Sequence, residues 1–215
     1  MSDLLISFIT YAESLPWLEL VAMLLALAYV LLAAAGSIWC WPAALISTAI
    51  YTYVFYDVLL LMDSALSIYY LVMAVYGYWA WQQRTPTKNE QSSPPLDIVS
   101  WQFSFHVKAC LVLTFIALAL GYIMANYTPA DFPYLDTFTT VFAVFATYLV
   151  AQKVLENWLY WIVIDAASIY LYIEKDLTPT AVLFILYTFI ATWGYFKWRS
   201  LYLGNRIAIK HRVNS

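Results

Sequence analysis

The chain has 215 residues, of which 64% are hydrophobic and only 11% are charged. A soluble globular domain typically has about 45–50% apolar and about 25% charged residues, so the composition excludes such a domain and indicates an integral membrane protein with helical spans. The formal net charge of −3 identifies no partner. Nucleic-acid binding is not expected, because no basic face exists outside the C-terminal tail.

Hydropathy divides the chain into segments that alternate between apolar spans and polar connections. Residues 1–16 are mixed and are compatible with a short interfacial segment. At about 20 apolar residues per span, the rest has room for seven transmembrane helices, predicted at residues 17–35, 39–56, 60–81, 107–125, 137–151, 158–173 and 180–198. Residues 83–100, rich in Pro, Gln, Ser and Thr, form a linker, and residues 199–215 form a polar, basic tail.

The distribution of Lys and Arg predicts the orientation of these spans. If the N-terminus lies outside, nine of the ten basic residues fall on the cytoplasmic side: Arg84, Lys88, Lys108, Lys153, Lys197, Arg199, Arg206, Lys210 and Arg212. Only Lys175 falls outside. This bias favours an odd number of spans, with a periplasmic N-terminus and a cytoplasmic C-terminus in the inner membrane.

The chain also repeats itself. The pattern of residues 50–58 recurs 119 positions later at 169–177, and that of residues 77–81 recurs 117 positions later at 194–198. The sequence therefore predicts a 3+1+3 parallel pseudo-repeat, in which residues 17–82 and 137–198 are three-helix repeats and 101–126 are the connector helix. At the first offset Trp39 corresponds to Trp158, and Ile46 corresponds to Asp165.

Asp165 stands near the middle of the sixth predicted span. A carboxylate at that depth costs about 2.5 kcal/mol or more, so an intramembrane acid marks a candidate functional site. On a helix, Asn157, Trp161 and Asp165 form one row, which Ser168 and Tyr172 continue. This face carries an acid, an aromatic ring and small polar groups, which is a combination that can bind a positively charged ring. The alternative is an Asp that pairs with a polar group on another helix and only aids packing.

Other polar groups lie at depth in the third and fifth spans. Asp63, Ser67 and Tyr70 share one face of the third span, where Asp63 could meet an entering cation or simply face water. Thr140 lies in the fifth span with Gln152 beside the same face, and close helix packing explains that pattern equally well. Lys153 and Glu156 are most simply a surface ion pair.

Catalytic and metal-binding signatures are missing from the sequence. No HExxH, GxSxG or Walker motif is present, and the two cysteines, Cys40 and Cys110, have no metal-ligand spacing and predict no disulfide. His106 and His211 lie far along the chain from Asp165. We therefore expect no enzyme activity, no cofactor and no metal.

Several motifs resemble the Pnu family of bacterial vitamin uptake proteins. They are Trp-Pro-x-x-Leu-Ile at 41–46, Tyr-Gly-Tyr-Trp-Ala-Trp at 76–81, residues 136–140, and Gln-Lys-x-x-Glu-Asn-Trp-x-x-Trp-x-x-x-Asp at 152–165. The resemblance implies a fold similar to that of SWEET sugar transporters. It also implies facilitated diffusion of an unphosphorylated vitamin, which a cytoplasmic kinase then traps without needing to contact the carrier. Homo-oligomerisation stays open.

The resemblance places Trp158, Trp161 and Asp165 at the substrate site. Nicotinamide riboside carriers of this family typically have Asn at the position of Asp165 and Gln at the position of Ser67. A carboxylate can accept from the amino group of thiamine, and Trp faces suit its thiazolium cation. The sequence therefore favours thiamine as the cargo, with nicotinamide riboside as the alternative and riboflavin as a less favoured third vitamin.

Overall fold

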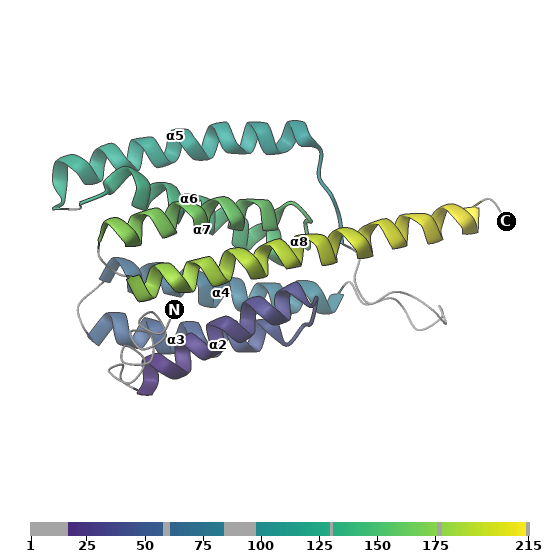
Figure 1. Ribbon diagram of the computed structural model, residues 1–215, viewed down its shortest axis with the longest axis horizontal. Coiled ribbons are helices and arrows are strands. Elements are labelled where there is room, and N and C mark those ends of the chain that lie inside the picture. Colours follow the sequence, from purple (N-terminus) through teal and green to yellow (C-terminus); the bar gives the residue numbers. More distant parts are fainter. Residues whose placement is uncertain (1–16, 58–60, 84–97, 130, 176–177, 214–215) are drawn as a thin grey trace. The chain divides into compact units, whose positions relative to one another are not determined.

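The structure is a computed structural model that describes residues 17–57, 61–83, 98–129, 131–175 and 178–213. These residues form seven helices and no strand, which confirms the predicted all-α membrane fold (Figure 1). The helices are α2 (Trp17–Ala34), α3 (Cys40–Asp57), α4 (Leu61–Gln83), α5 (Phe103–Tyr127), α6 (Pro133–Ala151), α7 (Asn157–Glu174) and α8 (Thr178–Val213). The predicted interfacial segment 1–16 and most of the linker lie outside the described residues.

Among the residues that the structure describes, three segments are long and apolar enough, by length and composition alone, to cross a membrane: Phe103–Tyr127, Pro133–Ala151 and Thr180–Ile207. Helices α3 and α7 have 18 residues each, or about 27 Å at 1.5 Å per residue, close to the hydrocarbon thickness of about 30 Å. They are less apolar because Ser, Thr, Asn, Asp, Tyr and Trp side chains interrupt them. Polar groups are therefore concentrated on specific helices.

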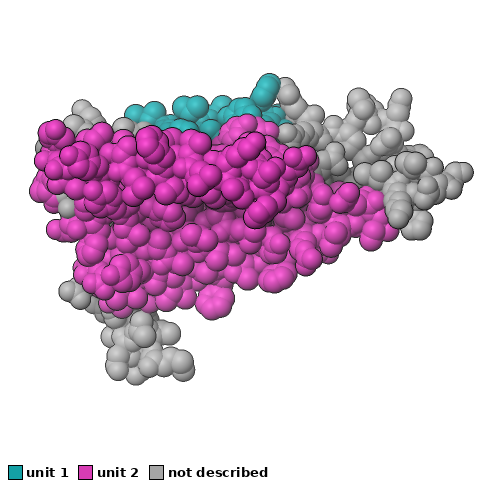
Figure 2. Space-filling view, turned by 90° about the horizontal axis from the view of Figure 1, so that it is seen from above, with its two compact units in different colours: residues 1–96 teal, residues 97–215 magenta. Residues whose placement is uncertain are grey.

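The chain divides into two compact units, residues 1–96 and 97–215, which Figure 2 colours separately. In the first unit α3 packs against both α2 and α4, and the Ser47 hydroxyl donates a 2.8 Å hydrogen bond to the carbonyl of Ala22. In the second unit α6 packs against α5 and α7, and α7 packs against α8. The Thr137 hydroxyl joins α6 to α5 by donating to the carbonyl of Ala117 over 2.9 Å.

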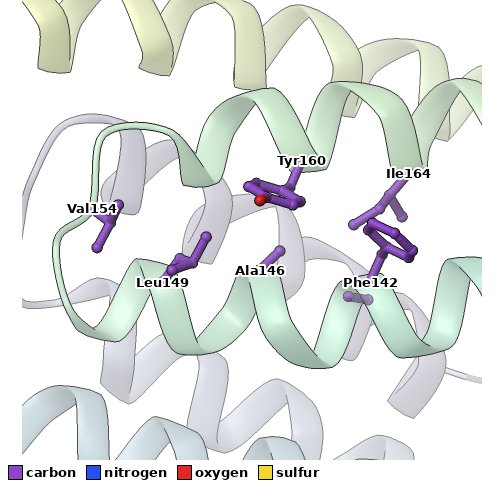
Figure 3. Packing of buried hydrophobic residues seen from close by; sticks show 7 residues of the cluster. Phe142, Ala146, Leu149, Val154, Tyr160 and Ile164 are labelled. Atoms are coloured by element: carbon purple, nitrogen blue, oxygen red, sulfur yellow. The ribbon is translucent and has the colours of Figure 1, made fainter. Parts of the chain in front are cut away.

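The core of the second unit lies between α6 and α7. Phe142 faces Ile164, and Ala146 lies beside the ring of Tyr160 (Figure 3). Leu149 closes this layer beside the α6–α7 turn. These side chains pack one face of α7 against α6. They therefore fix the register of α7 against α6 and determine which residues of α7 face away from α6.

The internal repeat appears in the structure with one constant offset of 117 positions. Helices α3 and α7 begin at Cys40 and Asn157 and end at Asp57 and Glu174, while α4 and α8 begin at Leu61 and Thr178. The indole of Trp41 meets Trp81 at 5.5 Å and 88°, and Trp158 meets Trp198 at the same 5.5 Å and 88°. These four tryptophans show that each unit builds the same aromatic contact.

This packing corrects the predicted correspondence within the repeat. Trp41, and not Trp39, is the partner of Trp158, since Trp39 is 69% exposed while Trp41 is buried. The position that corresponds to Asp165 is therefore Thr48 rather than Ile46, and Ile46 is 52% exposed. The error arose because an aromatic-rich stretch aligns with itself at both offsets, and only the packing separates them.

Helix α8 differs from its prediction at its C-terminal end. It runs without a break from Thr178 to Val213, 36 residues in all. Residues 199–213, predicted as part of a polar tail, thus continue the last helix. No proline follows Trp198, and Gly204 is the one residue there with a strong helix penalty.

Candidate functional site

The polar row of α7 forms a largely buried stripe. Asp165 is 4% exposed and Ser168 is 5% exposed, one turn apart on the same face. Trp161 is half-buried and packs against the α6–α7 core, while the ring of Tyr172 stacks on Phe184 of α8 at 5.2 Å. The stripe therefore follows the predicted spacing, with the carboxylate at its centre.

The Asp165 carboxylate has no hydrogen bond or ion pair with any residue that the structure describes. A buried charge without a partner is costly, and proteins pair such groups or keep them for a ligand. The alternative role for Asp165, pairing with a polar group on another helix, finds no support among the described residues. Its position favours a group that meets an external ligand.

Asn157 and Trp158 close the N-terminal end of α7. The amide of Asn157 is fully buried and donates 2.6 Å to the carbonyl of Val154, while its side-chain oxygen meets no donor among the described residues. Trp158 is 2% exposed and lies against Gly194, where an added Cβ would approach its ring to 2.9 Å. These two motif residues are held by packing, so they differ from the stripe around Asp165.

The other predicted site residues are spread over α4 and α6. Ser67 is buried, and Tyr70 is partly exposed with its ring 5.5 Å from that of Tyr69. Asp63 belongs to α4, but its side chain lies outside the described part of the chain. On α6, Thr140 is half-buried and Gln152 is the C-terminal cap, about 18 Å further along the helix. Thr140 and Gln152 therefore cannot share one small ligand.

The prediction of a surface ion pair between Lys153 and Glu156 is wrong. Lys153 is 2% exposed and has a φ of 55° in the turn between α6 and α7, where the next amide, of Val154, reaches back 3.0 Å to the carbonyl of Leu149. This is a Schellman-type helix end. The positive φ, rare for a residue with a Cβ, turns the chain from α6 into α7.

Glu156 instead anchors the segment that leads into α5. Its carboxylate accepts 2.5 Å from the Ser100 hydroxyl and 3.3 Å from the Trp101 amide. His106 lies 3.6 Å away through Nε2 and is 3.0 Å from the Tyr160 hydroxyl through Nδ1. This network went unpredicted; its only signal was the four-residue spacing of Glu156 and Tyr160 on one helix.

The turn is tied to the same segment through the backbone. The Val99 amide donates 3.0 Å to the carbonyl of Lys153, and the Leu155 amide donates 2.8 Å to the carbonyl of Val99. This short parallel bridge, together with the Glu156 carboxylate, holds the first turn of α7 against the start of α5. The position of the Asp165 stripe therefore depends on contacts about 14 Å away along α7, at 1.5 Å per residue.

No group of three or more His, Cys, Asp or Glu residues that could hold a metal ion occurs in the described ranges. The candidate site on α7 thus combines one buried acid, one buried hydroxyl and aromatic rings on a membrane helix. Such a stripe can bind a small, flat, cationic molecule by charge and stacking.

These features are those of a helical membrane protein with a buried polar stripe, and comparison with known proteins identifies its family. Residues 16–200 match the family described as "Nicotinamide mononucleotide transporter". The chain therefore belongs to this family, as the resemblance to the Pnu proteins predicted.

Two relatives and one solved structure illustrate the match. The chain is 25% identical over 204 residues to the nicotinamide riboside transporter PnuC of Escherichia coli, covering 86% of this chain and 85% of that one. It is 21% identical over 192 residues to the riboflavin/roseoflavin transporter RibM of Streptomyces davaonensis, covering 89% of each. A crystal structure of the vitamin B3 transporter PnuC has the same fold, with a TM-score of 0.72 at 20% identity over 94% of this chain and 87% of that one.

Proposed function

We propose that this protein carries nicotinamide riboside across the bacterial inner membrane. The observation that carries the proposal is the family match over residues 16–200, joined by the 25% identity to a nicotinamide riboside transporter over most of both chains. These findings favour the alternative cargo over thiamine, which the sequence alone favoured. Thiamine has no support from the relatives named above.

The α7 stripe suits this cargo chemically. Nicotinamide riboside is a pyridinium cation with a carboxamide and a ribose. The Asp165 carboxylate would attract the cation and accept a hydrogen bond, the Ser168 hydroxyl can donate or accept, and the Trp161 indole offers a face for the charged ring. Because Asp165 is buried and has no partner among the described residues, its side-chain oxygens would be available to a ligand.

Transport would proceed by facilitated diffusion, with a cytoplasmic kinase trapping the product by phosphorylation. The nine-to-one distribution of Lys and Arg supports a periplasmic N-terminus and a cytoplasmic C-terminus. The absence of a Walker motif from the sequence means that ATP hydrolysis by this chain is not part of the proposal.

The test is uptake of radiolabelled nicotinamide riboside into proteoliposomes that contain the purified full chain. We expect uptake to equilibrate without ATP and to persist when an uncoupler collapses the proton gradient. Unlabelled nicotinamide riboside should compete, whereas thiamine and riboflavin at the same concentration should not. Competition by thiamine alone would refute the proposed cargo but leave the transport function standing.

Thiamine remains the second candidate because of one observation. Asp165 stands where nicotinamide riboside carriers of the family typically have Asn, and a carboxylate also suits the aminopyrimidine of thiamine. Binding titrations of the same preparation with both vitamins, followed by tryptophan quenching, distinguish the two: the proposed cargo should bind at least tenfold more tightly, about 1.4 kcal/mol.

A further inference from the structure

The C-terminal third of α8 leaves the packed body of its unit. Trp198 is fully buried, but Leu201, Leu203 and Ile207 are 42%, 45% and 59% exposed. An added Cβ on Gly204 would meet no atom within 4 Å. In Figure 1 this yellow end of α8 runs beyond the ends of α7 and α5. Leu201, Leu203 and Ile207 therefore present apolar surface to their surroundings, and Gly204 lies in open space.

The length of α8 places this stretch at the membrane surface. The helix has 36 residues, or about 54 Å, while the hydrocarbon core of a bilayer is about 30 Å thick and the headgroup layers extend the total to about 40–45 Å. If the apolar segment that starts at Thr180 begins at one hydrocarbon boundary, the opposite boundary falls near Trp198. Arg199 and Arg206 then lie in the headgroup layer or just beyond it.

The charge of this stretch has a single sign. We define the C-terminal basic segment as residues 197–212, which contain five of the ten basic residues: Lys197, Arg199, Arg206, Lys210 and Arg212. No Asp or Glu follows Asp176 in the sequence. Arg199 and Arg206 are exposed and form no ion pair with a residue that the structure describes.

Aromatic rings on α8 support two of these cations. The Lys197 ammonium lies 4.8 Å from the centre of the Trp193 ring, and the Arg206 guanidinium lies 5.7 Å from that of Tyr202. Tyr and Trp prefer the interface between hydrocarbon and headgroups. The two pairs therefore agree with the helix length in placing this part of α8 at the headgroup layer. A cation over an aromatic face keeps its outer side free for an anion.

We propose that the C-terminal basic segment binds the phosphate headgroups of anionic phospholipids in the leaflet that it enters. Clusters of four to eight basic residues next to a membrane helix attract anionic lipid electrostatically. A lipid is favoured over a protein or a nucleic acid because the segment continues a membrane-spanning helix without a break, and its first basic residues lie at headgroup depth. This interaction does not depend on which vitamin is carried.

The test measures lipid selectivity of the full chain in phosphatidylcholine vesicles. Trace spin-labelled phosphatidylglycerol is compared with spin-labelled phosphatidylcholine, and the motionally restricted fraction gives their relative association. We expect the anionic lipid to be preferred by about twofold or more when averaged over all lipids in contact. The preference should fall in 0.5 M salt, where the Debye length is only a few ångströms.

Variants locate the effect. R199Q/R206Q should lose most of the preference, whereas R199K/R206K, which keeps the charge, should retain it. The matched control K108Q/K175Q removes two exposed charges elsewhere and should leave the preference unchanged. The proposal is overturned if the wild type shows no preference, if R199Q/R206Q keeps it, if the control loses it equally, or if R199K/R206K loses it.

Discussion

The Asp165 carboxylate makes the sharpest prediction, because it is 4% exposed and has no partner among the described residues. A hydrogen bond to a charged group contributes about 1.5–3 kcal/mol. If the cargo makes this contact, Asp165→Ala should weaken binding by about tenfold to a hundredfold. Asp165→Asn keeps an acceptor of the same shape but loses the charge, so it should fall between the wild type and Asp165→Ala.

The substitution Asp165→Asn should not weaken the folded protein. Burying an unpaired carboxylate is unfavourable, so Asp165→Asn should leave the thermal midpoint in detergent unchanged or raise it. Binding by isothermal titration and unfolding by tryptophan fluorescence give the two quantities separately. Asp131→Asn, on the exposed loop before α6, is the matched control and should change neither. Affinity that is unchanged in both Asp165 variants, or a lower midpoint in Asp165→Asn, would refute the reasoning.

Three further predictions concern the scaffold, and each is measured as a thermal midpoint in detergent. Glu156→Ala removes the acceptor of the Ser100 hydroxyl and should destabilise by about 1.5–3 kcal/mol, less whatever its partial exposure screens; an unchanged midpoint would show that the contact is not needed. Gly77→Ala and Gly194→Ala overpack a tryptophan and should each lose about 1–3 kcal/mol, more at Gly77, where the Cβ comes within 2.3 Å of the ring rather than 2.9 Å; equal losses would argue against it. Thr137→Val should lose about 1 kcal/mol through its bond to α5, and no loss would exclude that role.

The fold was predictable because apolar runs and the positions of basic residues depend on local sequence. Predicted and observed ends nevertheless differ where a terminal turn is polar. Helix α6 begins at Pro133 rather than residue 137, since proline suits the first helical position. At the other extreme, α8 continues to Val213, because charge ends a hydropathy signal but does not end a helix.

The geometry of the candidate site was predictable only in part. The row through Asp165 follows from helical periodicity, and both Asp165 and Ser168 are buried as that row requires. The Glu156 network was missed because its partners, Ser100 and His106, lie 56 and 50 positions away in the sequence. Periodicity relates residues on one helix and carries no information about which residue of a distant helix faces them.

The two tryptophan pairs have the same geometry, so the two units share this packing contact. The acid at Asp165 is present in one unit only. Trp41 with Gly77 and Trp158 with Gly194 have matching contacts, so selection for packing accounts for Trp158 without a ligand. Packing cannot account for the acid, because the position that corresponds to Asp165 in the other unit is Thr48, which is half-buried and carries no charge. The repeat thus supplies two copies of one scaffold. Only the second copy carries the acidic side chain, Asp165, that would bind the proposed cationic cargo.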